Sequence, residues 1–212
     1  PARRPAAPTR RTALGGLALG LLTGTLAGCG TFGPPRHEEE IPDVGYQPVD
    51  PARAVAVINA YRAQNGSGPL ELDAHLVRLA GEYAHHLAEA GRMTHELEPY
   101  GGLEKRLKAG GYAYATAGEN LGQGYRNLDQ VIRGWKNSPA HDRGMKDPDM
   151  TRMGIASAVN PRKAGDVYWC LMLAKPRPTG AAAVTDPFTP RREPEGKTHV
   201  WGTVQIPFFS GR

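Results

Sequence analysis

The feature that most constrains the fold is an apolar run near residue 170. Residues 166–174 read DVYWCLMLA, so a strand there would be apolar on both faces. Such a strand must be covered on both faces, as the central strands of layered domains are. A second run, RMGIASAV at 152–159, predicts another strand just before it. The chain therefore needs other elements to cover a sheet.

Helical patterns fill the chain before these two strands. Asp50 and Pro51 predict a helix start, and Asn65-Gly66 predicts its end. The strongest helical pattern covers 74–90, between a capping Asp73 and Gly91. Its apolar face, with helical spacing, consists of Leu76, Ala80, Tyr83 and Leu87. Shorter helices are expected within 103–111 and 127–137. Helices first and strands late indicate an α+β layered domain.

The first 29 residues have the order of a secretory signal. Four arginines lie before residue 12, an uncharged stretch follows, and small residues precede Cys29. The apolar part is short and diluted with Gly and Thr, whereas a membrane-spanning helix needs about 20 apolar residues. The ending Leu26-Ala27-Gly28-Cys29 resembles a bacterial lipobox, in which the cysteine is lipidated. The alternative is an ordinary cleavage site with a chance cysteine. We expect export and a lipid anchor at Cys29, with the export route and the membrane left open.

Composition shifts divide the rest of the chain. Residues 30–48 are polar and rich in Pro and Gly, which predicts a tether between membrane and domain. The domain is expected at 49–178. A Pro-rich tail, partly disordered, is expected at 179–212. Its segment THVWGTVQIPFF could add an edge strand, but Pro207 counts against that.

Charge and cysteine content argue against a nucleic-acid-binding protein and against a domain stabilised by disulfides. The formal net charge is +5, but four of the 26 basic residues belong to the leader, so no basic stripe argues for nucleic acid. The chain has two cysteines, Cys29 and Cys170. If Cys29 is lipidated, no intramolecular disulfide is possible, and the domain must rest on its own core. The neighbours of Cys170 indicate a buried, inert thiol.

Three short motifs carry the chemistry. They are MTHE with His95, GENLGQG with Glu119, and WKNSPAHDR with Ser138 and His141. Taken singly, His95 could face water, Glu119 could cap a turn, and His141 could be a solvated residue in a first helical turn. The glycines around Glu119 indicate a turn, because glycine tolerates positive φ. Asn120 would then hold that turn by bonding to loop backbone.

Together the motifs resemble the CAP superfamily of cysteine-rich secretory proteins, antigen 5 and pathogenesis-related 1 proteins. The likeness is to its bacterial branch of SCP-like extracellular proteins and covers about residues 49–175. The matching elements are INAYRAQNG, PLELDAHLVRLA, His95, Gly118-Glu119-Asn120, the set Trp135, Ser138, Pro139 and His141, and the two late strands. The resemblance implies a three-layer α-β-α sandwich with a central antiparallel sheet. It also implies a surface cleft lined by two histidines and two acidic residues.

Carried over, the resemblance assigns His95, Glu119 and His141 to this cleft. The fourth, acidic position falls on Ser138, and an asparagine common in the family is replaced by Gly144. His95 and His141 could hold a divalent metal such as zinc, and two histidines with one carboxylate form a catalytic zinc pattern. A metal-free site, with His and Glu as an acid/base pair, is the alternative.

Three functions are compatible with this reading. A binding module at the cell envelope would hold a lipid, a sterol or another envelope ligand in the cleft. A zinc-assisted hydrolase or peptidase would use the same residues for catalysis. A scaffold or adhesion protein would carry a vestigial site. No extended metal-ligand motif supports an enzyme, and Ser138 breaks the acidic tetrad, so binding is favoured over catalysis. The oligomeric state is left open.

Overall fold

The structure is a computed structural model that describes residues 45–177 and 196–205. The expected signal segment, Cys29 and most of the expected tether lie outside the described residues, as do 178–195 and 206–212 of the tail. Within the described ranges, no helix has the length and apolar character needed to cross a membrane.

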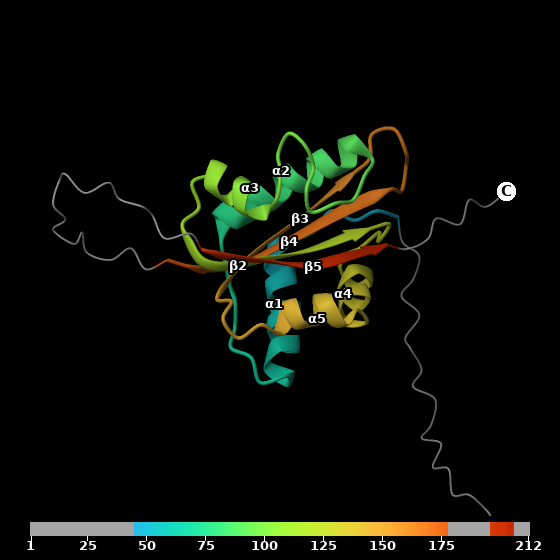
Figure 1. The fold of residues 1–212 in the computed structure, drawn as a ribbon. Helices are drawn as coiled ribbons and strands as arrows, with labels where there is room; N and C mark the ends of the chain where they lie inside the picture. Colours follow the sequence, from blue (N-terminus) through green and yellow to red (C-terminus); the bar gives the residue numbers. More distant parts are fainter. Residues whose placement is uncertain (1–44, 178–195, 206–212) are drawn as a thin grey trace, which may run out of the picture. The chain divides into compact units, whose positions relative to one another are not determined.

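A five-stranded sheet forms the middle layer, in the order β1-β3-β4-β2-β5 (Figure 1). The strands are β1 (Glu71–Leu72), β2 (Tyr114–Gln123), β3 (Arg152–Val159), β4 (Val167–Pro176) and β5 (Lys197–Gln205). β4 pairs antiparallel with β2 and β3, whereas both edge strands, β1 and β5, pair parallel. β4 is central and buried from Val167 to Ala174, which confirms the prediction from its apolar run.

Helices cover both faces of the sheet (Figure 1). They are α1 (Pro51–Gln64), α2 (Ala74–Ala90), α3 (Leu103–Ala109), α4 (Leu128–Lys136) and α5 (Pro139–Lys146). α2 and α3 lie on one face, and α1, α4 and α5 lie on the other, with a separate hydrophobic cluster in each layer. The expected α+β fold, a three-layer α-β-α sandwich, is confirmed. Its sheet is antiparallel in the centre and parallel at the edges.

Local signals set the ends of the helices as predicted. Asp50 caps α1 by accepting a hydrogen bond from the Ala52 amide at 2.9 Å. Asp73 caps α2 in the same way, and α2 ends at Gly91 in the left-handed conformation with φ of 62°. The four residues predicted to form the apolar face of α2 are all buried. This face packs on β3 and β4, and α2 forms part of the helical layer above the sheet in Figure 1.

The segment around Glu119 is a strand, and the prediction of a glycine-rich turn was wrong. β2 runs through Glu119, which pairs with Met172 of β4 and Val200 of β5. Gly118 is needed for close packing instead, because a Cβ there would lie 1.8 Å from the Trp201 ring. A glycine inside a strand often marks such a close approach.

The expected loose tail contains part of the folded domain. Residues 197–205 form β5, which pairs along β2 and ends before Pro207. The possible edge strand in this segment is therefore present. The folded unit extends beyond the predicted boundary at residue 178, because β5 returns to the sheet after residues that the structure does not describe.

Candidate functional site

A buried ion cluster surrounds Glu119. Its side chain has no exposed surface and lies on the face of β2 that packs against α2 and α3. Arg106 of α3 donates to both carboxylate oxygens, from Nη1 to Oε2 at 2.7 Å and from Nη2 to Oε1 at 2.9 Å. His95, between α2 and α3, places its Nδ1 2.8 Å from Oε1. Both oxygens of the carboxylate are thus engaged by protein groups.

Arg106 is itself held in place from several sides. Its guanidinium carbon lies 3.3 Å from the centre of the Tyr83 ring, which is a cation–π contact. Its Nε donates to the Gly101 carbonyl at 3.3 Å. The Tyr83 hydroxyl donates to the Thr94 carbonyl at 2.6 Å, next to His95. The cluster therefore fixes β2, α2, α3 and the loop that carries His95.

The electrostatics of the cluster favour the ion pair. Burial alone would raise the pKa of the Glu119 carboxyl, but Arg106 and His95 outweigh it and hold that pKa below its usual range. Burial opposes the charge of Arg106 as well, yet Glu119 raises the guanidinium pKa. The Cys170 thiol lies 3.5 Å from Glu119 Oε2, and burial followed by the Glu119 charge raises its pKa well above the usual value. Cys170 is buried, as predicted.

His141 belongs to the other helical layer. It lies on α5 and is almost fully buried. Its Nδ1 is 2.7 Å from Ser138 Oγ, and its carbonyl accepts from Asn120 Nδ2 at 3.1 Å. Asn120 follows Glu119 on β2, so the two side chains point to opposite faces of the sheet. The structure brings His95 and Glu119 into contact, and it places His141 on α5, with Ser138 and Asn120 among its partners.

Asn120 does not hold a turn, contrary to the sequence prediction. It lies inside β2 and ties this strand to α5 through the His141 carbonyl. The Asn120 Oδ1 atom is buried and has no hydrogen-bond partner among the described residues. The prediction failed because it followed from the glycine-rich turn that the structure replaces with a strand.

The donors around Glu119 do not fit the expected zinc pattern. Both carboxylate oxygens face the positive charge of Arg106, which opposes a cation at the same place. The Nδ1 atom of His95 also faces this carboxylate. Over 45–177 and 196–205, no group of three or more His, Cys, Asp or Glu side chains is arranged to hold a metal ion. Zinc binding by His95 and His141 stays a prediction, which calorimetry on the His95→Ala and His141→Ala variants would test.

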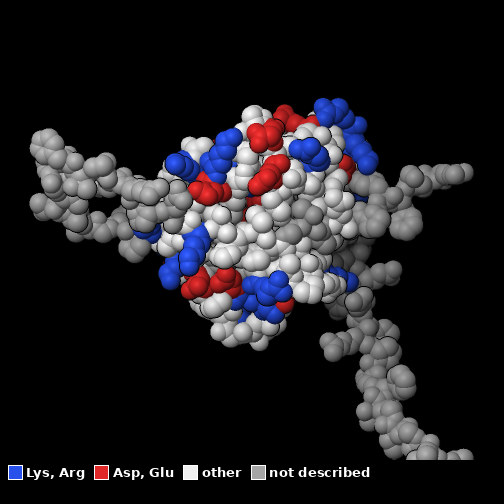
Figure 2. Space-filling view, viewed as in Figure 1, with Lys and Arg blue, Asp and Glu red and all other residues white. Residues whose placement is uncertain are grey.

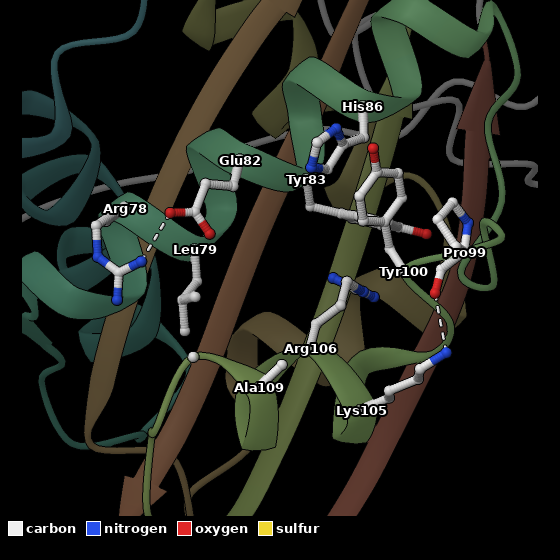
Figure 3. A pocket seen from close by; sticks show the side chains of 11 residues that line it. Arg78, Leu79, Glu82, Tyr83, His86, Pro99, Tyr100, Lys105, Arg106 and Ala109 are labelled. Atoms are coloured by element: carbon white, nitrogen blue, oxygen red, sulfur yellow. Dashed lines mark hydrogen bonds and ion pairs between the residues drawn. The ribbon is translucent and has the colours of Figure 1, made fainter.

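Two cavities adjoin the cluster. One of about 530 Å³ opens beside His95 and is lined by α3 and by Thr198 and Val200 of β5. The other, of about 340 Å³, lies between α2 and α3, with Tyr83 and Arg106 among its lining residues (Figure 3). Figure 2 shows basic and acidic side chains interspersed above and below a band without charge, at the level where Figure 1 places β5. Four of the nine residues that line the first cavity are charged: Glu96, Glu104, Lys105 and Lys108.

Sequence reasoning missed Arg106, the main partner of Glu119. For residues 103–111 the sequence pattern predicts only a short helix. A signal was present, because Leu103 and Leu107 flank Arg106 at helical spacing and place it on the buried face of α3. A basic residue on an apolar helix face calls for a buried acid elsewhere in the chain.

The sequence pattern of the cysteine-rich secretory protein family, CAP, matches residues 55–173. The chain belongs to the CAP family. Two curated relatives of this CAP protein come from Bacillus subtilis (strain 168). Uncharacterized protein YkwD is 29% identical over 103 residues, or 49% of this chain and 40% of its own. Uncharacterized membrane protein YlbC is 29% identical over 97 residues, which are 46% of this chain and 28% of YlbC. The CAP match thus spans less than half of each relative.

Solved structures show the same CAP fold. An extracellular protein containing an SCP domain from Bacillus anthracis str. Ames superposes with a TM-score of 0.53 and 18% identity, over 59% of this chain and 40% of the other. An outer surface protein from Borrelia burgdorferi superposes with a TM-score of 0.54 and 22% identity, over 62% of this chain and 99% of the other. At these identities the likeness establishes the fold. The family match ends at residue 173, before β5 begins.

Proposed function

We propose that this CAP domain is an exported binding module, held at the cell envelope by a lipid on Cys29, and that it is not a hydrolase. Its leader has the order of a secretory signal and ends in a lipobox-like Leu26-Ala27-Gly28-Cys29. Two proteins with the same fold are described as an extracellular protein and an outer surface protein. These observations support the location, and the geometry of Glu119 supports the function.

The observation that carries the proposal is that Arg106 and His95 occupy both oxygens of the ionised Glu119 carboxylate. A general base must reach a proton on its substrate, and a catalytic zinc needs free ligands and an open position. Glu119 is fully buried, both of its oxygens are bound, and its pKa is lowered, so it is a weak base. The ion cluster is therefore better suited to hold the elements around the site in place than to react with a substrate.

The space for a ligand is the cavity beside His95. Its volume of about 530 Å³ lies within the usual range for small-molecule sites. The His95 side chain is 15% exposed and borders this space, while its Nδ1 is held by Glu119. The cluster thus orients one imidazole toward a cavity whose other walls come from α3 and β5.

A hydrolysis assay separates the two functions. Wild-type protein and the Glu119→Gln variant are incubated with a fluorogenic peptide library, with and without added zinc. We expect no turnover above that of heat-inactivated protein. Turnover by the wild type that disappears in a folded Glu119→Gln variant would overturn the proposal.

Native mass spectrometry of the purified protein tests binding directly. We expect a small co-purified ligand that is lost in Gly102→Leu, which extends a side chain into the cavity. A Cβ at Gly102 would lie 3.7 Å from Glu96, an ordinary contact, so the variant should fold. Gly45→Leu is the control, because a Cβ there would meet nothing within 4 Å. A ligand-free spectrum for the wild type would count against a small ligand in this cavity.

A further inference from the structure

Strand β5 carries a tryptophan that fits between two glycines of other elements. Trp201 lies against Gly118 of β2 and Gly144 of α5. A Cβ on Gly118 would come within 1.8 Å of the Trp201 ring, and a Cβ on Gly144 within 2.4 Å. Neither position tolerates a larger residue while the ring is in place. We call Gly118 and Gly144 together the indole socket.

The indole socket accounts for a departure from the family pattern. Many CAP proteins have an asparagine where this chain has Gly144, and any side chain there would exclude Trp201. The His199 ring lies parallel to the Trp201 ring, with centroids 6.1 Å apart. From the same strand, Thr198 and Val200 line the cavity beside His95. One short strand therefore fills the socket and also closes a side of the proposed ligand space.

The connection to β5 is much longer than the fold requires. β4 ends at Pro176, opposite Tyr114, and β5 begins at Lys197, opposite Thr116 of the same strand β2. The two ends are therefore about two strand spacings apart, or about 10 Å. The 20 residues at 177–196 could reach about 66 Å when extended. β5 is at the sheet edge and pairs only with β2 among the described strands.

From these observations we propose that the edge of β2 and the indole socket form a docking groove for an extended peptide, and that β5 is its tethered, displaceable occupant. The partner is a protein segment with the chemistry of β5, which runs parallel to β2 and inserts a tryptophan into the socket. Main-chain hydrogen bonds give such strand addition its affinity, and side-chain pockets give it specificity. This inference rests on the proposed binding function and adds a peptide-binding site next to the cavity beside His95.

The covalent connection between β4 and β5 has a functional consequence. A linker keeps its segment near the groove at an effective concentration that reaches the millimolar range for short linkers and falls as the linker lengthens. A peptide from a partner must therefore compete with β5, so weak ligands are rejected. Displacement of β5 would also remove Thr198 and Val200 from the cavity beside His95. The groove and the cavity would open together.

A labelled peptide tests the groove in the full chain. The probe is KTHVWGTVQ, the sequence of β5, and binding is followed by fluorescence anisotropy. We expect Trp201→Ala to bind the peptide at least about tenfold more tightly than the wild type does, because the weakened strand competes less. The same peptide with alanine for tryptophan should not bind. Lys197→Ala, at an exposed position of the same strand that does not line the cavity, leaves the anchor intact and should behave as the wild type.

A second variant separates release of β5 from loss of folding. Gly144→Ala favours the helix but places a methyl group in the socket, so it should release β5 and also block the peptide. Hydrogen exchange should show lost protection in β5 for both variants, with β4 still protected. The proposal is overturned if β5 stays protected in both variants, if Trp201→Ala releases β5 and still does not bind the peptide, or if Gly144→Ala releases β5 and still binds it. Turnover in the hydrolysis assay would instead overturn the proposed function, whatever the peptide does.

Discussion

Arg106 holds Glu119 through two hydrogen bonds, and a lysine could supply only one point of contact. Arg106→Lys is expected to lower the free energy of unfolding by about 1–3 kcal/mol, measured by urea denaturation. The control is Arg78→Lys, which alters an exposed pair with Glu82 and should cost less than about 0.5 kcal/mol. Equal losses in the two variants would show that the buried bidentate geometry adds nothing.

The lowered pKa of Glu119 fixes how stability depends on pH. The ordinary pKa is 4.5, and the folded value lies below it. The unfolded state therefore binds the proton more readily, so the stabilisation is fully present above pH 4.5 and is lost as pH falls through the folded pKa. Urea unfolding at a series of acidic pH values should show a steeper decline for the wild type than for Glu119→Gln. Parallel declines would contradict this assignment of charge.

At the scale of secondary-structure elements, the packing of α2 on β3 depends on one glycine. A Cβ on Gly154 would lie 2.2 Å from the backbone of α2 at Leu76 and Val77, so the helix would have to move. Gly154→Ala should destabilise the domain by about 1–3 kcal/mol. Gly81→Ala is the matched control, because its Cβ would meet Ala156 at an ordinary 3.7 Å. A helical alanine there should be neutral or stabilising by up to about 1 kcal/mol. Thermal unfolding of both variants checks the opposite signs.

The elements that sequence predicted well are those with local signals. α2 has a cap, a periodic apolar face and a terminal glycine, and β4 has an uninterrupted apolar run. β2 has neither, since its sequence YATAGENLGQ is rich in small residues. Its glycines are needed because Trp201 packs against Gly118, and Val131 and Trp135 pack near Gly122. That requirement exists only once the layers are assembled, so it could not be read along the chain.

The site, too, was predicted where motifs mark it along the chain and was missed where a partner comes from another element. The family resemblance brought His95 and Glu119 to one place, and the structure shows them in contact. It did not supply Arg106, which meets Glu119 from another element. It also assigns His141 to the same cleft. The structure places this residue on α5, where its carbonyl accepts from Asn120, and the shared cleft stays a prediction. Motif spacing records which residues a family has in common but not the side chains that this chain adds around them.

At the scale of the whole molecule, the proposed function has the leader anchor the protein and the CAP domain bind the ligand. Cys29→Ala should release the protein from membranes, because the lipid would have no attachment point. Cell fractionation followed by immunoblotting measures this. Cys170→Ala is the matched control, since its thiol is buried in the domain, and it should leave membrane retention unchanged. Retention of the Cys29→Ala protein would refute the lipid anchor.

Removal of β5 tests how the folded unit and the docking groove are related. A chain that stops after Arg177 keeps both helical layers and the three antiparallel strands, so it should remain folded by circular dichroism. It also exposes the edge of β2, and open edges pair with other chains. We therefore expect concentration-dependent association in sedimentation velocity, reversed by added KTHVWGTVQ peptide. A truncated chain that does not fold would make β5 part of the obligatory core. In that case β5 could not be exchanged for a partner strand, because the groove would not exist without it.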